Sequence, residues 1–341
     1  MTDDVDDLPR DVSLVHWNTF GVASRAEFAA RITSLHELEK LTARLHERGL
    51  PLTILGGGSN VILRARVPGC VARIDIPGID IEHIDGGARV TAGAGVRWHD
   101  LVRYCLGQGL FGIENLALIP GRVGAAPMQN IGAYGSELAD CFESLTAYST
   151  DTGASSRYER DACEFAYRDS VFKRRPELVI TSVSLRLSHT WSERSDYPGL
   201  DEMLNQQGGP RTPTRIAEAV IALRRYKLPD SRQHGNAGSF FKNPTLSTAR
   251  FDELRAADPG LPGFETSSGV KVPAARLIER CGWKGRRLGA VGVWHRQPLV
   301  LINLGGATGR DLLNVADQIT ADVAQRFAVD LELEPRVLGV D

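Results

Sequence analysis

Two glycine-rich segments have the composition of a phosphate-binding site. The first, Gly56-Gly57-Gly58-Ser59-Asn60, follows the apolar residues Leu52–Leu55, which we expect to form a strand. Successive glycines allow backbone N–H groups to converge on an anion without interference from Cβ atoms. The run matches neither the G-x-G-x-x-G pattern nor the Walker pattern, so a tight turn is an equally good interpretation of this segment alone.

The second segment covers residues 120–135, where small side chains leave room for a bulky ligand against the main chain. Its glycines and its prolines, Pro120 and Pro127, exclude a regular helix over residues 119–135. Two such segments in one chain suit the pyrophosphate of a dinucleotide better than they suit two structural turns.

A serine in a flexible loop is a candidate for proton or acyl transfer. Residues 235–244 place Ser239 between glycines and the two aromatic residues Phe240 and Phe241. The G-x-S-x-G elbow of hydrolases is absent because Phe241 occupies its last glycine position. His234 is five residues away, and nothing in the sequence pairs it with Ser239. A loop serine that caps its own turn is the alternative interpretation.

Two further charged positions could act on a carboxylate or a proton. Arg168 lies in the run Tyr167-Arg168-Asp169-Ser170, and a guanidinium can hold a carboxylate in a bidentate fork, although a lone surface arginine is usually only solvated. Glu332 and Glu334 share the polar face of an expected last strand, and periodicity does not choose between them. Pro335 ends that strand and leaves Glu334 at a position that could overlook a pocket.

The composition is that of a globular protein of two or three domains. The chain has 341 residues, 42% hydrophobic and 24% charged, which excludes a disordered or fibrous class. Lys+Arg number 40 and Asp+Glu number 42, so the formal charge of −2 gives no basic field for nucleic acid or an acidic membrane. An anionic ligand must therefore be held by a local cluster of charges or amides.

The cysteines and the hydropathy pattern favour a soluble, cytoplasmic protein. The five cysteines are scattered without a C-x-x-C pair, so we expect reduced thiols and neither a disulfide framework nor a metal site. The acidic N-terminus has no apolar stretch typical of a signal peptide. The longest apolar runs, such as residues 299–302, are far shorter than the ~20 residues that a membrane helix needs.

Periodicity predicts a mixture of helices and short strands. We expect helices over residues 34–49, 98–106 and 308–327, the first with Ser34 and Glu37 and the last with Thr308 and Asp311 in capping-box spacing. A further helix is expected to begin near Thr212-Pro213, after a polar, turn-rich stretch at 188–212 that suggests a domain boundary. Strands are expected over residues 52–55, 61–63, 71–76, 179–187 and 329–334. This mixture predicts α+β domains rather than regular βαβ winding.

Taken together, these segments resemble the UDP-N-acetylenolpyruvoylglucosamine reductases, the MurB family of flavoenzymes in bacterial cell-wall precursor synthesis. The resemblance runs from Trp17-Asn18-Thr19-Phe20-Gly21 to Leu333-Glu334-Pro335-Arg336 and so covers nearly the whole chain. Its other motifs follow in family order: Leu55-Gly56-Gly57-Gly58-Ser59-Asn60, Asn115-Leu116-Ala117-Leu118-Ile119-Pro120-Gly121, Gln129-Asn130-Ile131-Gly132-Ala133-Tyr134-Gly135, Tyr167-Arg168-Asp169-Ser170-Val171-Phe172-Lys173 and residues 235–244.

The resemblance implies a two-subdomain FAD-binding fold of the vanillyl-alcohol-oxidase type plus a C-terminal α+β substrate-binding domain. The implied boundaries are 1–70 and 71–211 for the two FAD-binding subdomains and 212–341 for the substrate domain. FAD would be bound without a covalent link, with its pyrophosphate at the two glycine-rich segments. The implied cofactor-binding residues are Gly56, Gly57, Gly58, Ser59, Asn60, Pro120, Gly121, Gly124, Asn130, Gly132, Ala133 and Tyr134.

The resemblance also implies the reaction. NADPH would reduce FAD and leave, and UDP-N-acetylglucosamine enolpyruvate would then accept a hydride from flavin N5 at its vinyl carbon, giving UDP-N-acetylmuramate. By match to the family motifs, Ser239 is the general acid, Arg168 stabilises the enolate-like charge, and Glu334 orients the intermediate or shares a proton with it. Anchoring the last motif on Arg336 and Gly339 favours Glu334 over Glu332.

The resemblance assigns four residues to the substrate, with Tyr197 as the covering tyrosine of the longer subtype: Tyr197, Lys227, Asn243 and Lys271. Pro298, after His295-Arg296-Gln297, departs from the family pattern and removes a polar contact with substrate. The implied partners are UDP-N-acetylglucosamine enolpyruvate and NADPH, with no nucleic acid and no membrane, and the chain is expected to be a monomer.

Two other functions are compatible with parts of the sequence. An oxidase on the same flavin fold would pass electrons to oxygen, but residues 238–244 and the C-terminal domain argue against it. A non-catalytic sensor of flavin or UDP-sugar would not need Arg168, Ser239 and Glu334 together. Turnover of NADPH with and without the enolpyruvyl sugar separates these functions from the reductase.

Overall fold

The computed structural model describes residues 8–341, which form two compact units. The first unit runs up to Val12 and continues over Ala26–Gly58 and Pro68–Arg225. The second unit comprises Ser13–Arg25, Ser59–Val67 and Tyr226–Asp341. Each unit therefore combines segments that are distant in sequence, and the three-part division at residues 70 and 211 stays a prediction.

A four-stranded sheet with the order β1-β2-β5-β3 holds the first glycine-rich segment. Its strands are β1 (Arg10–Ser13), β2 (Arg25–Ile32), β5 (Arg66–Ile74) and β3 (Leu52–Leu55). Strands β3 and β5 are parallel, with Leu55 opposite Arg73, so the carboxyl end of β3 leads directly into Gly56. Helix α1 (Leu35–Glu47) buries Leu38, Leu41 and Leu45 in the core cluster of this sheet.

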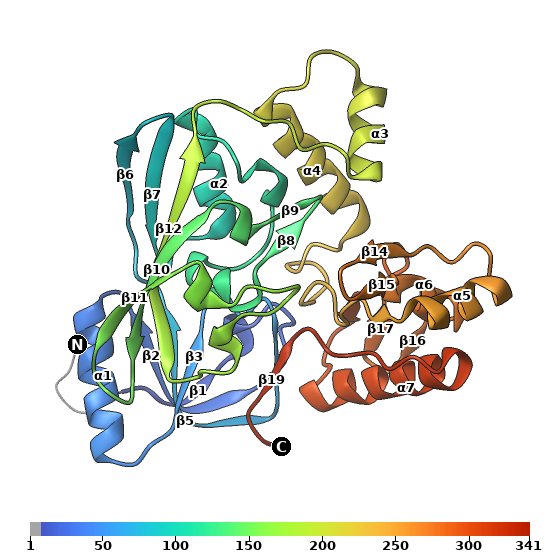
Figure 1. Cartoon of the computed structure of the whole chain (residues 1–341). Coiled ribbons are helices and arrows are strands. Elements are labelled where there is room, and N and C mark those ends of the chain that lie inside the picture. The colour runs from blue at the N-terminus through green and yellow to red at the C-terminus, as the bar shows by residue number, and fades with distance from the viewer. Residues whose placement is uncertain (1–7) are drawn as a thin grey trace. The chain divides into compact units, whose positions relative to one another are not determined.

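A five-stranded antiparallel sheet forms the rest of the first unit (Figure 1). Its order is β11 (Ser155–Glu159), β10 (Phe142–Ser149), β12 (Leu178–Ser188), β7 (Gly87–Gly93) and β6 (Ile79–Ile84). Three helices contribute apolar side chains to its core: α2 (Trp98–Gly107), α3 (Pro198–Gln207) and α4 (Pro213–Lys227). The small pair β8 (Gly132–Ala133) and β9 (Ser136–Glu137) lies within the second glycine-rich segment and just after it.

The second unit contains two three-stranded sheets and a two-stranded one. The first is β16 (Arg287–Leu288), β17 (Val291–Val293) and β18 (Leu301–Asn303), and the second is β13 (Thr245–Leu246), β15 (Gly269–Lys271) and β14 (Phe264–Thr266). The third pairs β19 (Arg336–Leu338) in parallel with β4 (Val61–Leu63). Its helices are α5 (Thr248–Ala257), α6 (Ala274–Arg280) and α7 (Gly309–Phe327).

Short 3-10 turns carry much of the remaining chain, including the second glycine-rich segment. They are η2 (Val15–Trp17), η3 (Glu114–Leu116), η4 (Val123–Ala125), η5 (Pro127–Gln129), η6 (Leu138–Asp140), η7 (Asp161–Cys163) and η8 (Val171–Lys173). The absence of a regular helix over residues 119–135 is confirmed. Among the described residues, 8–341, no helix combines the length and the apolar composition needed to cross a bilayer.

The predicted helices are confirmed, with one difference at a cap. Thr308 and Asp311 form the reciprocal capping box of α7, as their spacing predicts. At α1 the Ser34 hydroxyl accepts from Glu37 N, and the Glu37 carboxylate accepts mainly from Thr33 N, at 2.6 Å, one residue before the predicted donor.

The strand predicted over residues 329–334 is wrong. Only an isolated bridge between Leu333 and Phe241 forms there, and the last strand, β19, begins after Pro335. The partner segment cannot extend the ladder because Pro244 has no N–H to donate. The polar stretch at 188–212 is not continuous loop either, because α3 lies within it and buries Leu200 and Leu204 in the first unit's core.

Candidate active site

The two glycine-rich segments meet in the first unit. A Cβ atom on Gly57 would lie 3.0 Å from the Cα of Gly121, and one on Gly56 would lie 3.3 Å from the Cβ of Ala125. These separations are shorter than ordinary carbon contacts, so the two backbones approach as closely as they do only because side chains are missing.

The second glycine-rich segment is fixed along residues 94–98 by backbone hydrogen bonds. Gly124 N donates to Ala94 O at 3.0 Å, Val123 N to Val96 O at 2.9 Å, and Trp98 N to Gly121 O at 3.1 Å. A Cβ on Gly124 would lie only 2.5 Å from that of Ala94. These hydrogen bonds fix residues 121–124 of the segment against residues 94–98.

The first glycine-rich segment leaves backbone donors for a ligand. No group within residues 8–341 accepts a hydrogen bond from the N–H groups of Gly56 or Gly57. They follow the carboxyl end of β3, and backbone amides left without an acceptor can bind an anion. The diphosphate of a dinucleotide cofactor therefore fits this site.

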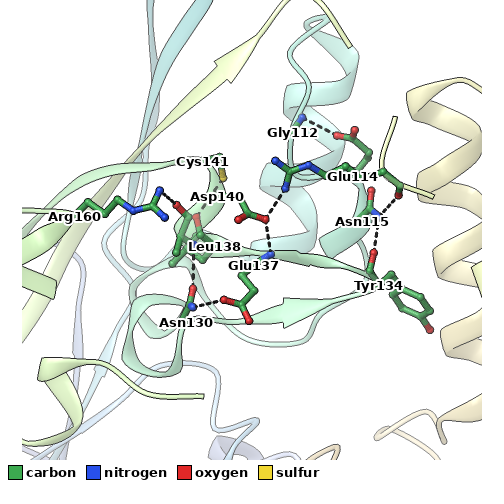
Figure 2. Close-up of polar contacts among 12 residues, drawn as sticks. Gly112, Glu114, Asn115, Asn130, Tyr134, Glu137, Leu138, Asp140, Cys141 and Arg160 are labelled. Atoms are coloured by element: carbon green, nitrogen blue, oxygen red, sulfur yellow. Dashed lines mark hydrogen bonds and ion pairs between the residues drawn. The ribbon is translucent and has the colours of Figure 1, made fainter. Parts of the chain in front are cut away.

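The rest of the second segment is braced by the side chain of Asn130, shown in Figure 2. Asn130 has a left-handed backbone (φ 43°) and is buried. Its amide donates to a Glu137 carboxylate oxygen at 2.7 Å, and its carbonyl oxygen accepts from Ala139 N at 3.0 Å. The predicted cofactor residue Asn130 thus uses its side chain to shape the segment.

Tyr134 connects this segment to the predicted substrate-covering residue Tyr197. Its carbonyl accepts a 2.8 Å hydrogen bond from the buried amide of Asn115, which also donates to Arg194 O at 2.7 Å (Figure 2). The rings of Tyr134 and Tyr197 meet edge to face with centroids 5.2 Å apart. Burial raises the pKa of the Tyr134 phenol, and Tyr197 adds to the rise while Arg224 opposes it.

Arg168 is bound to the same segment. Its Nη2 donates to Gly132 O at 2.7 Å, and a Cβ on Gly132 would lie 3.2 Å from its Nη1. The backbone of Arg168 is left-handed (φ 54°), a strained conformation for a residue with a side chain. The flanking Ser170 is fully buried and donates from Oγ to Met128 O at 2.9 Å, which helps to keep that conformation.

Arg224 is a charged neighbour of this cluster that the sequence analysis missed. It is half-buried on α4, and its Nε donates to Leu118 O at 3.2 Å. Burial lowers the pKa of Arg224, with Tyr134 opposing the shift and the positive charge of Arg168 adding to it. Two guanidinium groups that repel each other in this way favour an anionic ligand. In the sequence, Arg224 and Arg225 are two consecutive arginines of a helix, a pattern that does not distinguish an anion-binding arginine from a solvent-exposed one.

In the second unit, the Ser239 loop depends on a close backbone approach at Gly235. A Cβ there would lie 2.0 Å from Phe20 O, and Gly235 O accepts from Asn303 N at 2.8 Å. After Ser239, Phe240 and Phe241 are buried with ring centroids 5.5 Å apart, and Phe240 N donates to Leu299 O at 2.7 Å. Both ends of the loop are therefore anchored.

The turn at Ser239 is capped by another residue. Asn236 Oδ1 accepts from Gly238 N at 3.0 Å, and its buried amide donates to Pro229 O and His234 O. The Ser239 hydroxyl is half-buried and has no hydrogen-bond partner within residues 8–341. The turn-capping alternative for Ser239 is wrong, and the sequence analysis missed Asn236. His234 lies against Trp294, with ring centroids 5.4 Å apart.

The two candidate glutamates differ in their surroundings. Glu332 is largely exposed and its carboxylate pairs with the Lys242 ammonium. Glu334 is half-buried, and its backbone N–H donates to Phe240 O at 3.0 Å. Because Phe240 directly follows Ser239, this bond places the Glu334 backbone beside the serine, whereas Glu332 contacts the same loop at Lys242, three residues further along. Asn60 lies beside the segment that follows Glu334: the backbone carbonyl of Asn60 accepts from Arg336 N at 3.1 Å.

The remaining predicted substrate residues lie at element ends of the second unit. Asn243 Oδ1 accepts from Ala274 N at 3.0 Å and so caps α6, while its NH₂ group has no partner within residues 8–341. Lys227 ends α4, with its carbonyl accepting from the Trp294 indole at 3.1 Å. Lys271 ends β15 and is half-buried.

Comparison with known proteins identifies the family. An FAD binding domain model matches residues 26–154, and a model of the UDP-N-acetylenolpyruvoylglucosamine reductase C-terminal domain matches residues 230–338. The UDP-N-acetylenolpyruvoylglucosamine reductase of Burkholderia multivorans is 48% identical over 332 residues, 95% of each chain. The chain belongs to the UDP-N-acetylenolpyruvoylglucosamine reductase family. The reductase of Paraburkholderia xenovorans is 47% identical over 93% of this chain and 94% of its own.

Solved structures agree with this family. The UDP-N-acetylenolpyruvylglucosamine reductase of Thermus caldophilus superposes with a TM-score of 0.66 and 27% identity, over 96% of this chain and 98% of that one. For 6-hydroxy-D-nicotine oxidase of Arthrobacter nicotinovorans the TM-score is 0.51, with 17% identity over 90% and 82% of the chains, a likeness of fold alone. The predicted α+β fold, with an FAD-binding domain followed by a C-terminal reductase-family domain, is confirmed.

Proposed function

We propose that Ser239, Arg168 and Glu334 perform the family's reaction in this chain. The chain is an FAD-dependent oxidoreductase that reduces UDP-N-acetylglucosamine enolpyruvate to UDP-N-acetylmuramate with NADPH, in peptidoglycan precursor synthesis. The observation that carries our assignment of residues is the backbone bond from Glu334 to Phe240, which joins the glutamate segment to a serine loop whose hydroxyl has no partner among residues 8–341.

The FAD diphosphate is held, we propose, at Gly56, Gly57 and Gly121, with Asn130 and its neighbours shaping the remainder of the cofactor site. The support is the pair of backbone amides with no internal acceptor and the close approach of the two glycine-rich segments. Contacts of this kind need no covalent link to the polypeptide. When bound, FAD supplies the hydride that the vinyl carbon of the substrate accepts.

Arg168 stabilises the negative charge that develops next to the substrate carboxylate. A guanidinium remains protonated throughout the physiological range and matches a carboxylate in a bidentate fork. Its bond to Gly132 O orients it before substrate arrives, so little reorganisation is needed during the reaction.

Ser239 protonates the carbon that bears the carboxylate. A serine hydroxyl is a weak acid, but a carbanionic carbon is a stronger base than the serine alkoxide, so transfer needs no lowered pKa. Glu334 orients the intermediate or shares a proton with it. Lys227, Asn243 and Lys271 grip the UDP-sugar, with the unpaired NH₂ group of Asn243 as a donor, and Tyr197 covers it.

Further properties belong to the same proposal. The chain acts as a cytoplasmic monomer that needs neither nucleic acid nor a membrane, and its functional divisions are residues 1–70, 71–211 and 212–341. Burial raises the pKa values of Cys70, Cys105, Cys141 and Cys163 to about 12, so these four thiols are protonated at neutral pH.

NADPH consumption with and without UDP-N-acetylglucosamine enolpyruvate tests the proposal. We expect oxidation of NADPH that depends on the sugar and yields one UDP-N-acetylmuramate per NADPH, under air and under nitrogen alike. Sugar-independent oxidation coupled to oxygen would indicate an oxidase instead. Binding of both ligands without turnover would indicate a sensor.

A further inference from the structure

A buried carboxylate lies directly behind the second glycine-rich segment. Asp75, one residue beyond the end of β5, has a side chain only 6% exposed. Its Oδ1 lies 2.6 Å from Nη2 of Arg122, which separates Gly121 from Val123. The other oxygen, Oδ2, lies 2.6 Å from Nη2 of Arg31 and 3.1 Å from Nη2 of Arg73. Three guanidinium groups therefore share one acid.

The backbone around Asp75 is closely packed. Arg122 Nη1 donates to Gly95 O, and a Cβ on Gly95 would lie 2.1 Å from the carbonyl carbon of Asp75. Gly95 N donates to Ile76 O at 2.8 Å. Asp75, Gly95 and Arg122 thus form a continuous connection from the end of strand β5 to the second segment.

The same sheet edge carries the first glycine-rich segment. Leu55, the residue before Gly56, is opposite Arg73 in the parallel β3–β5 pair. On the other side, the Cβ position of Gly56 lies 3.9 Å from the Cβ of Arg122. Asp75 therefore pairs with Arg73, which lies beside the first glycine-rich segment, and with Arg122, which lies in the second.

The charge balance of the cluster keeps Asp75 ionised. Burial opposes ionisation, but hydrogen bonds from Arg31 and Arg73 and the charges of Arg122 and Arg73 outweigh it and hold the pKa of Asp75 below its ordinary value. Removing the charge of Asp75 takes away the carboxylate that these three guanidinium groups share, which is destabilising.

We propose that Asp75 is a positioning residue for FAD, which acts through Arg122 to fix the second glycine-rich segment against the first. It does not touch the reacting atoms. The inference rests on the proposed location of the FAD diphosphate at these two segments. An outer residue that orients a binding group typically contributes about 10- to 100-fold in affinity.

The sign of the effect distinguishes positioning from simple electrostatics. Asp75→Asn removes a negative charge near a dianionic group, so a purely electrostatic role predicts tighter FAD binding. A positioning role predicts the opposite, because Arg122 loses its partner and the segment shifts. Asp80→Asn is the matched control, since Asp80 is an exposed acid on β6, the next strand along the chain.

The experiment is titration of FAD into apoprotein, followed by flavin fluorescence, with circular dichroism to establish folding. We expect the Kd of FAD to rise roughly 10- to 100-fold in Asp75→Asn and in Arg122→Gln, and by less than about 2-fold in Asp80→Asn. The double variant should be no weaker than the weaker single variant, because both changes break one connection. At saturating FAD, kcat should return to the wild-type value.

An unchanged or lower Kd in folded Asp75→Asn overturns the inference, as does strict additivity in the double variant. If Asp75→Asn does not fold, Arg122→Gln decides: wild-type affinity in that variant overturns the inference. Failure of the wild-type apoprotein to bind FAD would overturn the proposed function instead, so the two failures are distinguishable.

Discussion

The cofactor segments and the Ser239 loop use the chain in opposite ways. At Gly56, Gly57 and Gly121 the binding groups are backbone amides, and the decisive feature is the absence of side chains. At Ser239 the decisive group is a side chain, and the backbone around it is occupied by hydrogen bonds to Asn236, Leu299 and Glu334. Cofactor affinity should therefore be sensitive to added volume, whereas the proton-transfer site should be sensitive to removed functional groups.

After the loss of the Ser239 hydroxyl, the largest effect is expected where side-chain chemistry is lost at Arg168. Arg168→Lys keeps the charge but loses the planar fork and the second donor, so reoxidation of reduced flavin by the enolpyruvyl sugar should slow roughly 10²- to 10³-fold. Flavin reduction by NADPH should remain close to wild type. Stopped-flow absorbance of the two half-reactions measures both rates.

Arg174→Lys is the matched control for this change. Arg174 is half exposed and forms only surface ion pairs with Asp169 and Glu164, so both half-reactions should keep their rates within about 2-fold. Equal losses in the two half-reactions of Arg168→Lys would indicate a general disturbance of the second segment.

An intermediate effect is expected from adding one carbon to the cofactor segments. In Gly57→Ala the new Cβ would lie 3.0 Å from Gly121, and overpacking of this kind costs about 1–3 kcal/mol, or roughly 5- to 150-fold in FAD affinity. Flavin fluorescence titration checks the value. Gly107→Ala, where nothing lies within 4 Å of the new Cβ, should bind FAD normally; equal affinities in the two variants would contradict the backbone account.

The smallest effect is expected from Asn236, which supports the serine loop without touching the reaction. Asn236→Ala removes the acceptor of the half-buried Gly238 N, and loss of this hydrogen bond lowers the free energy of unfolding by about 1 kcal/mol. Urea unfolding of the variant and of Asn314→Ala, an exposed helix position, provides the comparison. Equal free energies of unfolding in the two variants would mean that the turn depends on local backbone preference alone and not on the Asn236 side chain.

Local patterns predicted the elements best where the signal is contained within one element. The Thr308–Asp311 cap and the apolar face of α7 are examples. The strand over residues 329–334 was predicted wrongly because the alternation of apolar and polar residues describes a single segment, whereas a strand also needs a partner segment. The partner segment here pairs only at Phe241 and contains Pro244, which has no N–H to continue the ladder. For α3, a helix whose sequence carries many turn-forming residues, burial of Leu200 and Leu204 outweighs local propensity.

The site shows the same limit. Glycine spacing and family motifs predicted the two segments and the serine loop, because those features depend on neighbours in sequence. Arg224 and Asp75 were missed because their importance arises from distant partners such as Tyr134 and Arg122. A polar residue with a partner far away in sequence has the same local pattern as a solvated one.

The two half-reactions of Ser239→Ala test the central claim most directly. Stopped-flow absorbance follows reduction of the flavin by NADPH and then its reoxidation by UDP-N-acetylglucosamine enolpyruvate. The account predicts normal FAD binding and reduction, with reoxidation slowed roughly 10²- to 10⁴-fold and partly restored in Ser239→Cys, whose thiol can also donate a proton. Unchanged reoxidation, or equal losses in both half-reactions, would contradict the assignment of Ser239 as the proton donor.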